Sequence, residues 1–191
     1  MKVLISAKFE DYILNKYLLL DNDFLSELFR NEYLNEEFIS KAYKSFLIVD
    51  KLTEFEFLRD LYLPQEQSDW NVFLNKGQFS ILSFTSPISI KILENALLLS
   101  RIYKHNSNGD RRKASYADLS LAARVMLNKT LLITGNKVDF PNCIFNVLGI
   151  ISAEQKDGIF KNFYLIEFDE SKFNKTYSEY EIMQTKSCVK L

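Results

Sequence analysis

The chain has 191 residues, enough for one domain with a substantial hydrophobic core. Hydrophobic residues make up 47% of it and charged residues 26%, which is ordinary for a folded protein and excludes a disordered, low-complexity chain. A formal net charge of −1 argues against a surface that binds nucleic acid over its whole extent, and leaves room for a local basic patch.

Apolar runs and helical patterns alternate in the first third of the chain. The elements expected there are strands at 2–5 and 17–20, helices from near Phe24 and over 34–45, a strand at 46–49, and a helix from Thr53 toward Tyr62. Asp21-Asn22-Asp23 ends the second apolar run and supplies side chains that can cap the first of these helices. Pro64 is expected to end the helix that Thr53 caps.

The remaining chain continues the alternation. Residues 65–78 are polar and aromatic, and we expect a loop-rich segment there. The later elements are a strand at 79–84, a helix that begins at Ser86-Pro87, a helix over 116–127 capped by Ser115, a strand at 130–133 and a strand at 160–168. The tail after Asp169 is polar and has no clear pattern.

Strands that alternate with helices predict an α/β fold: a three-layer α/β/α sandwich with a central, mostly parallel sheet. We expect residues 1–168 to form a single domain, followed by a C-terminal extension, residues 169–191, of unknown role. In parallel sheets, ligand sites gather beyond the carboxyl ends of the strands. Asp21 follows one such end directly, and Asn136 and Asp139 follow another.

Four acidic residues stand at the end of a predicted strand or near the start of a predicted helix: Asp21, Glu56, Asp118 and Asp139. Carboxylates that converge make a hard-oxygen site suited to Mg²⁺ or Mn²⁺. Each acid also has a structural explanation. Asp21 can cap the helix that follows it, and the last acid can stabilise the turn at Gly135-Asn136. Glu56 lies three residues after Thr53, and Asp118 three after Ser115, which is the spacing of a capping box.

The segments around the four acids resemble, in order, the acidic motifs of the PIN-domain nucleases. Leu20–Leu28 looks like the opening strand and Asp-Thr-Asn segment of that family, and Thr53–Leu58 looks like its Glu-containing motif. Asp118–Ala123 is similar to its Asp-x-x-Ile-Ala-Ala helix start, and Thr134–Phe140 to its Thr-x-Asn-x-x-Asp-Phe segment. The resemblance covers residues 15–150. Asp23 stands where the family usually has Asn, and it either adds a candidate carboxylate to the site or faces away as a helix cap.

The resemblance implies a PIN-like fold and an Mg²⁺- or Mn²⁺-dependent ribonuclease that hydrolyses phosphodiester bonds. Asp21 and Asp118 would be direct metal ligands, and Glu56 and Asp139 would complete the shell or orient water. Asn136 would hold a ligand carboxylate or the scissile phosphate, and Thr134 is a weaker candidate for the same role. The basic residues expected beside the acids are Arg111, Arg112, Lys113 and Lys137, which can contact RNA phosphates or form solvated loops.

The resemblance also suggests partners. Single-stranded RNA is the expected substrate, and the toxin half of a toxin–antitoxin pair is the leading biological role, with an antitoxin protein as partner. An RNA-maturation nuclease without an antitoxin and a non-catalytic scaffold that binds RNA or protein are the alternatives. The aromatic-rich composition suggests a homodimer.

Cys143 and Cys188 form neither a metal-binding spacing nor a disulfide framework, which indicates reduced thiols in a cytoplasmic protein. The N-terminal apolar stretch is too short for a signal peptide, and the most apolar later region is interrupted by Lys91 and Glu94. We therefore expect no membrane association.

Overall fold

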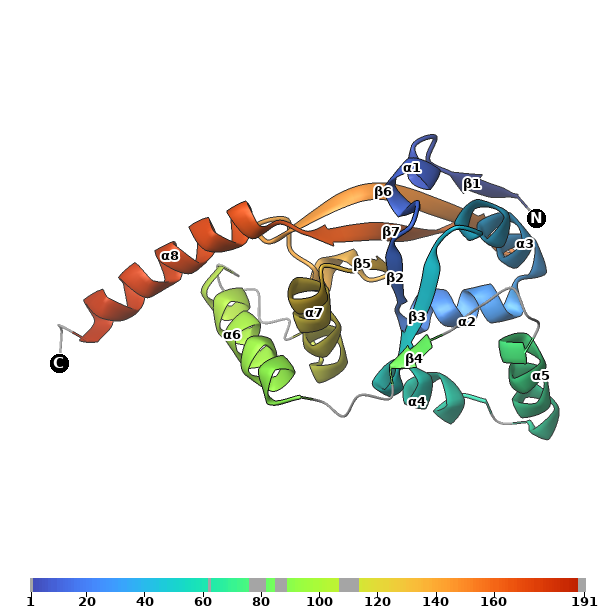
Figure 1. Ribbon diagram of the computed structural model, residues 1–191, viewed down its shortest axis with the longest axis horizontal. Coiled ribbons are helices and arrows are strands. Elements are labelled where there is room, and N and C mark those ends of the chain that lie inside the picture. The colour runs from blue at the N-terminus through green and yellow to red at the C-terminus, as the bar shows by residue number, and fades with distance from the viewer. Residues whose placement is uncertain (1, 62, 76–81, 85–88, 107–113, 189–191) are drawn as a thin grey trace.

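The computed structural model describes residues 2–61, 63–75, 82–84, 89–106 and 114–188 (Figure 1). Its strands form one sheet in the order β1-β6-β7-β5-β2-β3-β4. The strands are β1 (Val3–Ile5), β2 (Tyr17–Leu20), β3 (Phe46–Asp50), β4 (Leu82–Phe84), β5 (Leu131–Thr134), β6 (Phe145–Glu154) and β7 (Phe160–Phe168). The helices are α1 (Phe9–Ile13), α2 (Asn22–Arg30), α3 (Glu32–Ala42), α4 (Lys51–Arg59), α5 (Pro64–Asn75), α6 (Ile90–Asn106), α7 (Tyr116–Asn128) and α8 (Glu170–Cys188).

The parallel half of the sheet comprises β5, β2, β3 and β4. Leu19 of β2 lies opposite Leu132 of β5 on one side and Ile48 of β3 on the other, and both pairings are parallel. All of these residues are buried, because helices cover both faces of the sheet at this point. Strands buried on both faces have continuous apolar sequences, which is why the short runs at 17–20 and 46–49 predicted strands correctly.

The other half of the sheet is antiparallel, so the predicted mostly parallel, PIN-like sheet is wrong. β6 and β7 form a long hairpin, and β7 then pairs antiparallel with β5 while β1 pairs antiparallel with β6. The sequence analysis identified β7 and missed β6. The hairpin turn carries Asp157-Gly158, with Gly158 at a φ of 81° that glycine adopts without strain. That pair between two apolar runs was a hairpin signal.

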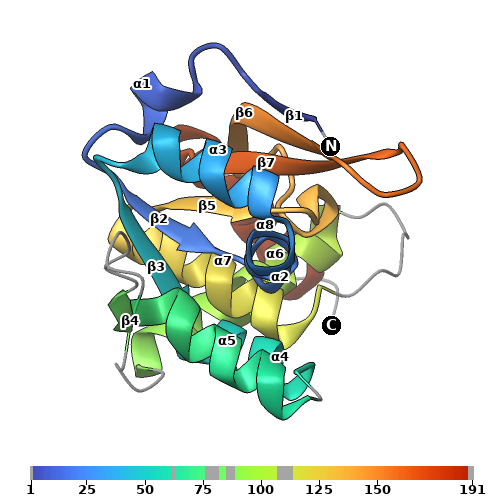
Figure 2. The same cartoon turned by 90° about the vertical axis from the view of Figure 1, so that its right-hand side faces the viewer.

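Two hydrophobic cores lie on opposite faces of the sheet (Figures 1 and 2). One core joins side chains of α1, α2, α3, α4 and α5 to alternate strand residues such as Leu18 and Leu20. The other joins α6, α7 and the first half of α8 to the strand residues between them, such as Leu19. The period of two along each strand therefore divides its apolar side chains between the cores.

Two segments differ from their expected structure. The segment 65–78 was predicted to be loop-rich, but its residues 65–75 belong to α5, because Trp70 and Phe73 pack against Phe29 of α2 and Phe57 of α4. Residues 76–78 lie outside the described residues. The tail forms α8, whose C-terminal part projects from the body (Figure 1). No described helix is both long and apolar enough to cross a membrane.

Candidate functional site

Three parallel strands end at one edge of the sheet and bring the predicted acids toward each other. Asp21 directly follows β2, Asp50 ends β3, and Thr134 ends β5. The helix that follows β3 carries Glu56, and α7 carries Asp118. Because parallel strands share one direction, their carboxyl ends lie along one edge of the sheet, where ligand sites of such sheets are usually found.

Asp21 is the most deeply buried of the four acids. Its Oδ1 accepts a 2.7 Å hydrogen bond from the backbone N–H of Asn22. Asp21 therefore caps α2, as its structural explanation predicted. Its Oδ2 accepts a 2.6 Å bond from the hydroxyl of Thr134. The two hydrogen bonds lower the pKa of Asp21, but burial outweighs them and raises it to about 6. The negative charges of Asp23 and Asp118 add to that rise.

Asp23 is held against the loop that follows β5. Its Oδ2 lies 3.1 Å from the position that a Cβ on Gly135 would occupy, a tight approach, so a larger residue at 135 would require the carboxylate to shift by a few tenths of an ångström. Asp23 also raises the pKa of both Asp21 and Glu56 through its charge. It therefore belongs to the acidic cluster.

Glu56 has no capping role. The helix predicted to start at Thr53 begins two residues earlier, at Lys51, and Asp50 caps it by accepting a 2.7 Å hydrogen bond from Leu52 N–H. Thr53 is thus a buried residue inside the helix, and the capping box expected for Glu56 is wrong. Burial raises the pKa of Glu56, Arg59 opposes that rise, and Asp118 adds to it.

Asp118 caps α7, which is one of the two roles that the sequence left open, and its charge reaches two of the other acids. It forms a complete capping box with Ser115: its backbone N–H donates to the Ser115 hydroxyl at 3.1 Å, and its Oδ2 accepts from Ser115 N–H at 3.1 Å. Its charge also raises the pKa values of Asp21 and Glu56. Asp118 therefore caps α7 and contributes to the acidic cluster at once.

Asp139 lies on the far side of the β5 loop, in a short 3-10 turn over Lys137–Asp139. Its Oδ2 accepts a hydrogen bond from the side-chain amide of Asn136, whose backbone N–H donates to the Thr134 hydroxyl at 3.0 Å. The loop thus links Asp139 to Asp21 through Asn136 and Thr134. Burial raises the pKa of the Tyr103 hydroxyl, and Cys143, Asp139 and Asp118 add to that rise.

A buried ion pair at this edge of the sheet was not predicted from the sequence. Arg124 of α7 contacts the carboxylate of Asp50, and both side chains are almost fully buried. The pair ties the end of β3 to α7, the helix that carries Asp118. Asp50 follows an apolar run just as Asp21 does, so its position at a strand end could have been predicted. No local pattern indicated that Arg124, 74 positions later, would be its partner.

The predicted substrate-binding cations are only partly described. Arg111, Arg112 and Lys113 lie outside the described residues. Lys137 places its Nζ 5.7 Å from the centre of the Tyr164 ring, a cation–π contact on β7.

The donor set suits a hard divalent cation. Within the described ranges, no three Asp, Glu, His or Cys side chains surround one point as metal ligands. The acids that share one electrostatic field offer only carboxylate oxygens, which Mg²⁺ and Mn²⁺ prefer. Asp21 and Glu56, whose pKa values are raised partly by neighbouring carboxylates, are groups whose charge a cation would stabilise. The side chains therefore match such an ion in chemistry, while the described residues do not surround one in this structure.

No family model matches the chain, and no curated protein matches it in sequence.

Proposed function

We propose that this chain is an Mg²⁺- or Mn²⁺-dependent ribonuclease that hydrolyses phosphodiester bonds in RNA. One observation carries the proposal: near the carboxyl ends of the parallel strands, carboxylates from separate segments are close enough to affect one another's pKa, and burial raises the pKa of Asp21 there to about 6, with Asp23 and Asp118 adding to the rise. Burying like charges together is unfavourable for folding, so a cluster of this kind is typical of a functional site. The likeness of these segments to PIN-domain nuclease motifs supports the same activity.

Each acid has a different proposed role, which follows from its position. Asp21 and Asp118 would bind the cation directly, Glu56 would orient water from α4, and Asp139 would complete the shell from the β5 loop. When bound, the cation neutralises the clustered charge and activates water for attack on phosphorus. Thr134 fixes the orientation of the Asp21 carboxylate through its 2.6 Å hydrogen bond, so the ligand is held before substrate arrives.

Within this activity, the toxin of a toxin–antitoxin pair is the specific role that the motif likeness supports, and an RNA-maturation nuclease is the alternative. Either role requires positive charge for RNA. Lys137, on the same loop as Asp139, is the described cation closest in sequence to the acids.

A non-catalytic scaffold is the second candidate, and one observation favours it. Asp21 and Asp118 both cap helices, so two of the four acids have a structural reason to be present. Glu56 distinguishes the two candidates, because it caps nothing and still lies in the field of the other carboxylates.

Cleavage of a mixed pool of single-stranded and structured RNA tests the proposal. Wild type, Asp21→Asn and Glu56→Gln are each incubated with Mn²⁺ or with a chelator, and a matched DNA pool separates the two nucleic acids. We expect Mn²⁺-dependent cutting of RNA by the wild type and none by either variant. Equal cutting by wild type and Glu56→Gln would contradict the proposed site. Absence of both cutting and Mn²⁺ binding by folded wild type would favour the scaffold.

A further inference from the structure

Helix α6 exposes a stripe of aliphatic side chains on its outer side. Its inner side, through residues such as Ile92 and Leu99, packs into the core that it shares with α7. Ile90, Leu93 and Leu97 lie on the other side and are 73%, 44% and 53% exposed. Their spacing of three and four residues places them on one face of the helix. Figure 1 shows α6 at the outside of the body, beyond α7.

Two opposite charges flank Leu97 on this face. Glu94 precedes Leu97 by three residues and Arg101 follows it by four, so all three share one side of the helix. Both charged side chains are exposed, and within the described part of the chain neither forms a salt bridge. They cannot pair with each other in one helix, because seven residues rise about 10 Å. Each charge therefore remains free to pair with a group outside the chain.

An antiparallel arrangement of two such helices satisfies both charges. A two-fold axis beside Leu97 brings this residue against its own copy. Glu94 lies about 4.5 Å before Leu97 along the helix and Arg101 about 6 Å after it, so reversal of the second helix places its Arg101 beside Glu94. The contact occurs again on the other side of the axis, because a two-fold interface repeats each contact. A parallel arrangement would instead bring like charges together, which is unfavourable.

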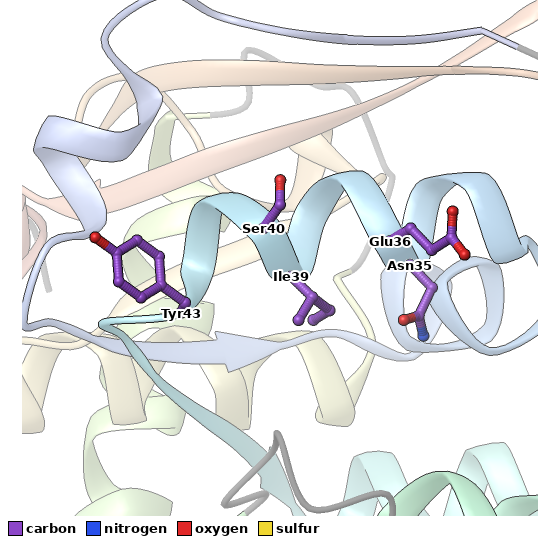
Figure 3. A pocket seen from close by; sticks show the side chains of 5 residues that line it. All are labelled: Asn35, Glu36, Ile39, Ser40 and Tyr43. Atoms are coloured by element: carbon purple, nitrogen blue, oxygen red, sulfur yellow. The ribbon is translucent and has the colours of Figure 1, made fainter.

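The hollow along α3 is not self-complementary in this way. It has a volume of about 560 Å³ and lies on the other side of the sheet from α6. The described residues that line it are Asn35, Glu36, Ile39, Ser40 and Tyr43 (Figure 3). Among them Ile39 is the single aliphatic residue, and Glu36 has no cation to meet across a two-fold axis. The outer face of α6 is therefore the better surface for a second copy.

We propose that the α6 face, formed by Ile90, Leu93, Glu94, Leu97 and Arg101, binds the same face of a second copy in an antiparallel, two-fold symmetric dimer. The aliphatic side chains leave water at the centre of the interface, and the reciprocal Glu94–Arg101 pairs lie at its rim. One helix pair is a small interface, so the expected dissociation constant is on the order of 1–100 μM. The dimer does not depend on the proposed nuclease activity, because none of the four acids lies on α6.

Sedimentation equilibrium of the full chain, over about 1–500 μM so as to span the expected dissociation constant, tests the dimer. Leu97→Lys is the first variant, because it places like charges together at the two-fold axis and keeps a good helix former. Leu58→Lys is the matched control, since Leu58 is 37% exposed on α4, whose core lies on the other side of the sheet. Circular dichroism melts establish that each variant is folded.

Charge reversal tests the antiparallel pairing itself. Glu94→Arg and Arg101→Glu each put like charges together, whereas Glu94→Arg/Arg101→Glu restores opposite ones. The single reversals change the net charge in opposite directions, so a loss common to both cannot come from net charge.

We expect Leu97→Lys to raise the dissociation constant of the dimer at least about tenfold, since like charges in contact are strongly unfavourable. Each single reversal should raise it about three- to tenfold, because two exposed pairs are lost at once. The double reversal and the Leu58→Lys control should associate like wild type.

A wild type that stays monomeric at the highest concentration would overturn the proposal. A dimer that Leu97→Lys leaves intact would also overturn it, because the contact would then lie elsewhere. A dimer weakened by both single reversals and not restored by the double reversal would exclude the antiparallel pairing.

Discussion

The hydroxyl of Thr134 donates a 2.6 Å hydrogen bond to Oδ2 of Asp21, and this bond joins the ends of β5 and β2. The residues are 113 positions apart in sequence, and both are buried. The same hydroxyl accepts from Asn136 N–H at 3.0 Å, which extends the link into the loop that carries Asp139. The orientation of the central carboxylate thus depends on a neutral group from a different strand.

Thr134→Val should lower the free energy of unfolding by about 1–3 kcal/mol, because it removes a hydrogen bond to a charged group at unchanged volume. It should also raise the pKa of Asp21 further, since the Thr134 bond lowers that pKa. Thr130→Val is the matched control: the Thr130 hydroxyl is buried and has no hydrogen-bond partner among the described residues. We expect that control to be neutral or stabilising in urea denaturation, and equal losses for the two variants would contradict the role of Thr134.

Asp21→Asn should stabilise the metal-free protein near neutral pH. The folded-state pKa of about 6 lies above the ordinary value of 3.8, so the folded state binds the proton more tightly than the unfolded state. The stability from this group is fully present below pH 3.8 and is lost as pH rises through about 6. The variant should therefore gain roughly 3 kcal/mol over wild type above pH 7 and nothing below pH 4, as a shift of one pKa unit corresponds to about 1.4 kcal/mol. Urea denaturation across this pH range measures the difference, and a variant less stable than wild type at neutral pH would refute it.

Mn²⁺ should raise the melting temperature of wild type. At a free concentration of about 100 times Kd, linkage contributes about 2.7 kcal/mol, or roughly 5–10 °C for a chain of this size. Glu56→Gln should lose this shift while its own stability changes by about 0.5 kcal/mol or less, because Glu56 caps no helix. Differential scanning fluorimetry with and without Mn²⁺ measures both effects.

Ser115→Ala is the control for that experiment. It removes the cap of α7 and the hydroxyl that donates to the Asp118 carboxylate, which should cost about 1 kcal/mol, but it keeps every carboxylate and the backbone N–H of residue 115 that also donates to Asp118. The rise in melting temperature that Mn²⁺ causes should therefore persist, starting from a lower melting temperature. A shift that survives in Glu56→Gln but disappears in Ser115→Ala would mean that the helix cap, rather than the acidic cluster, responds to the ion.

Arg124→Met should destabilise the protein by about 3–5 kcal/mol, because it leaves the Asp50 charge buried without its partner. Asp50→Asn/Arg124→Met should recover a large part of that loss, since Asn can still accept the hydrogen bond from Leu52 N–H. A double-mutant cycle in urea measures the coupling between the two residues. A double variant no more stable than Arg124→Met would show that the loss comes from packing of the arginine stem.

The sequence by itself determined those strands and helices that a few adjacent residues specify. The apolar runs at 17–20 and 46–49 predicted β2 and β3, and Ser115 predicted the start of α7, because a buried strand and a capped helix are written in a few adjacent residues. It also placed Asp21 at the end of a strand. The likeness of its acidic segments to nuclease motifs remains a prediction about function.

The tertiary structure alone decided the direction of the strands and the surroundings of the acids. The missed β6 reverses the chain before β7, so half of the strand pairs became antiparallel. α4 begins at Lys51 because the Asp50 carboxylate caps it, and the same carboxylate pairs with the distant Arg124. The hydrogen bond between Thr134 and Asp21 and the contact of Asp23 with Gly135 likewise join distant segments. Such pairings depend on which surfaces meet when the cores pack, and no local pattern in the chain encodes them.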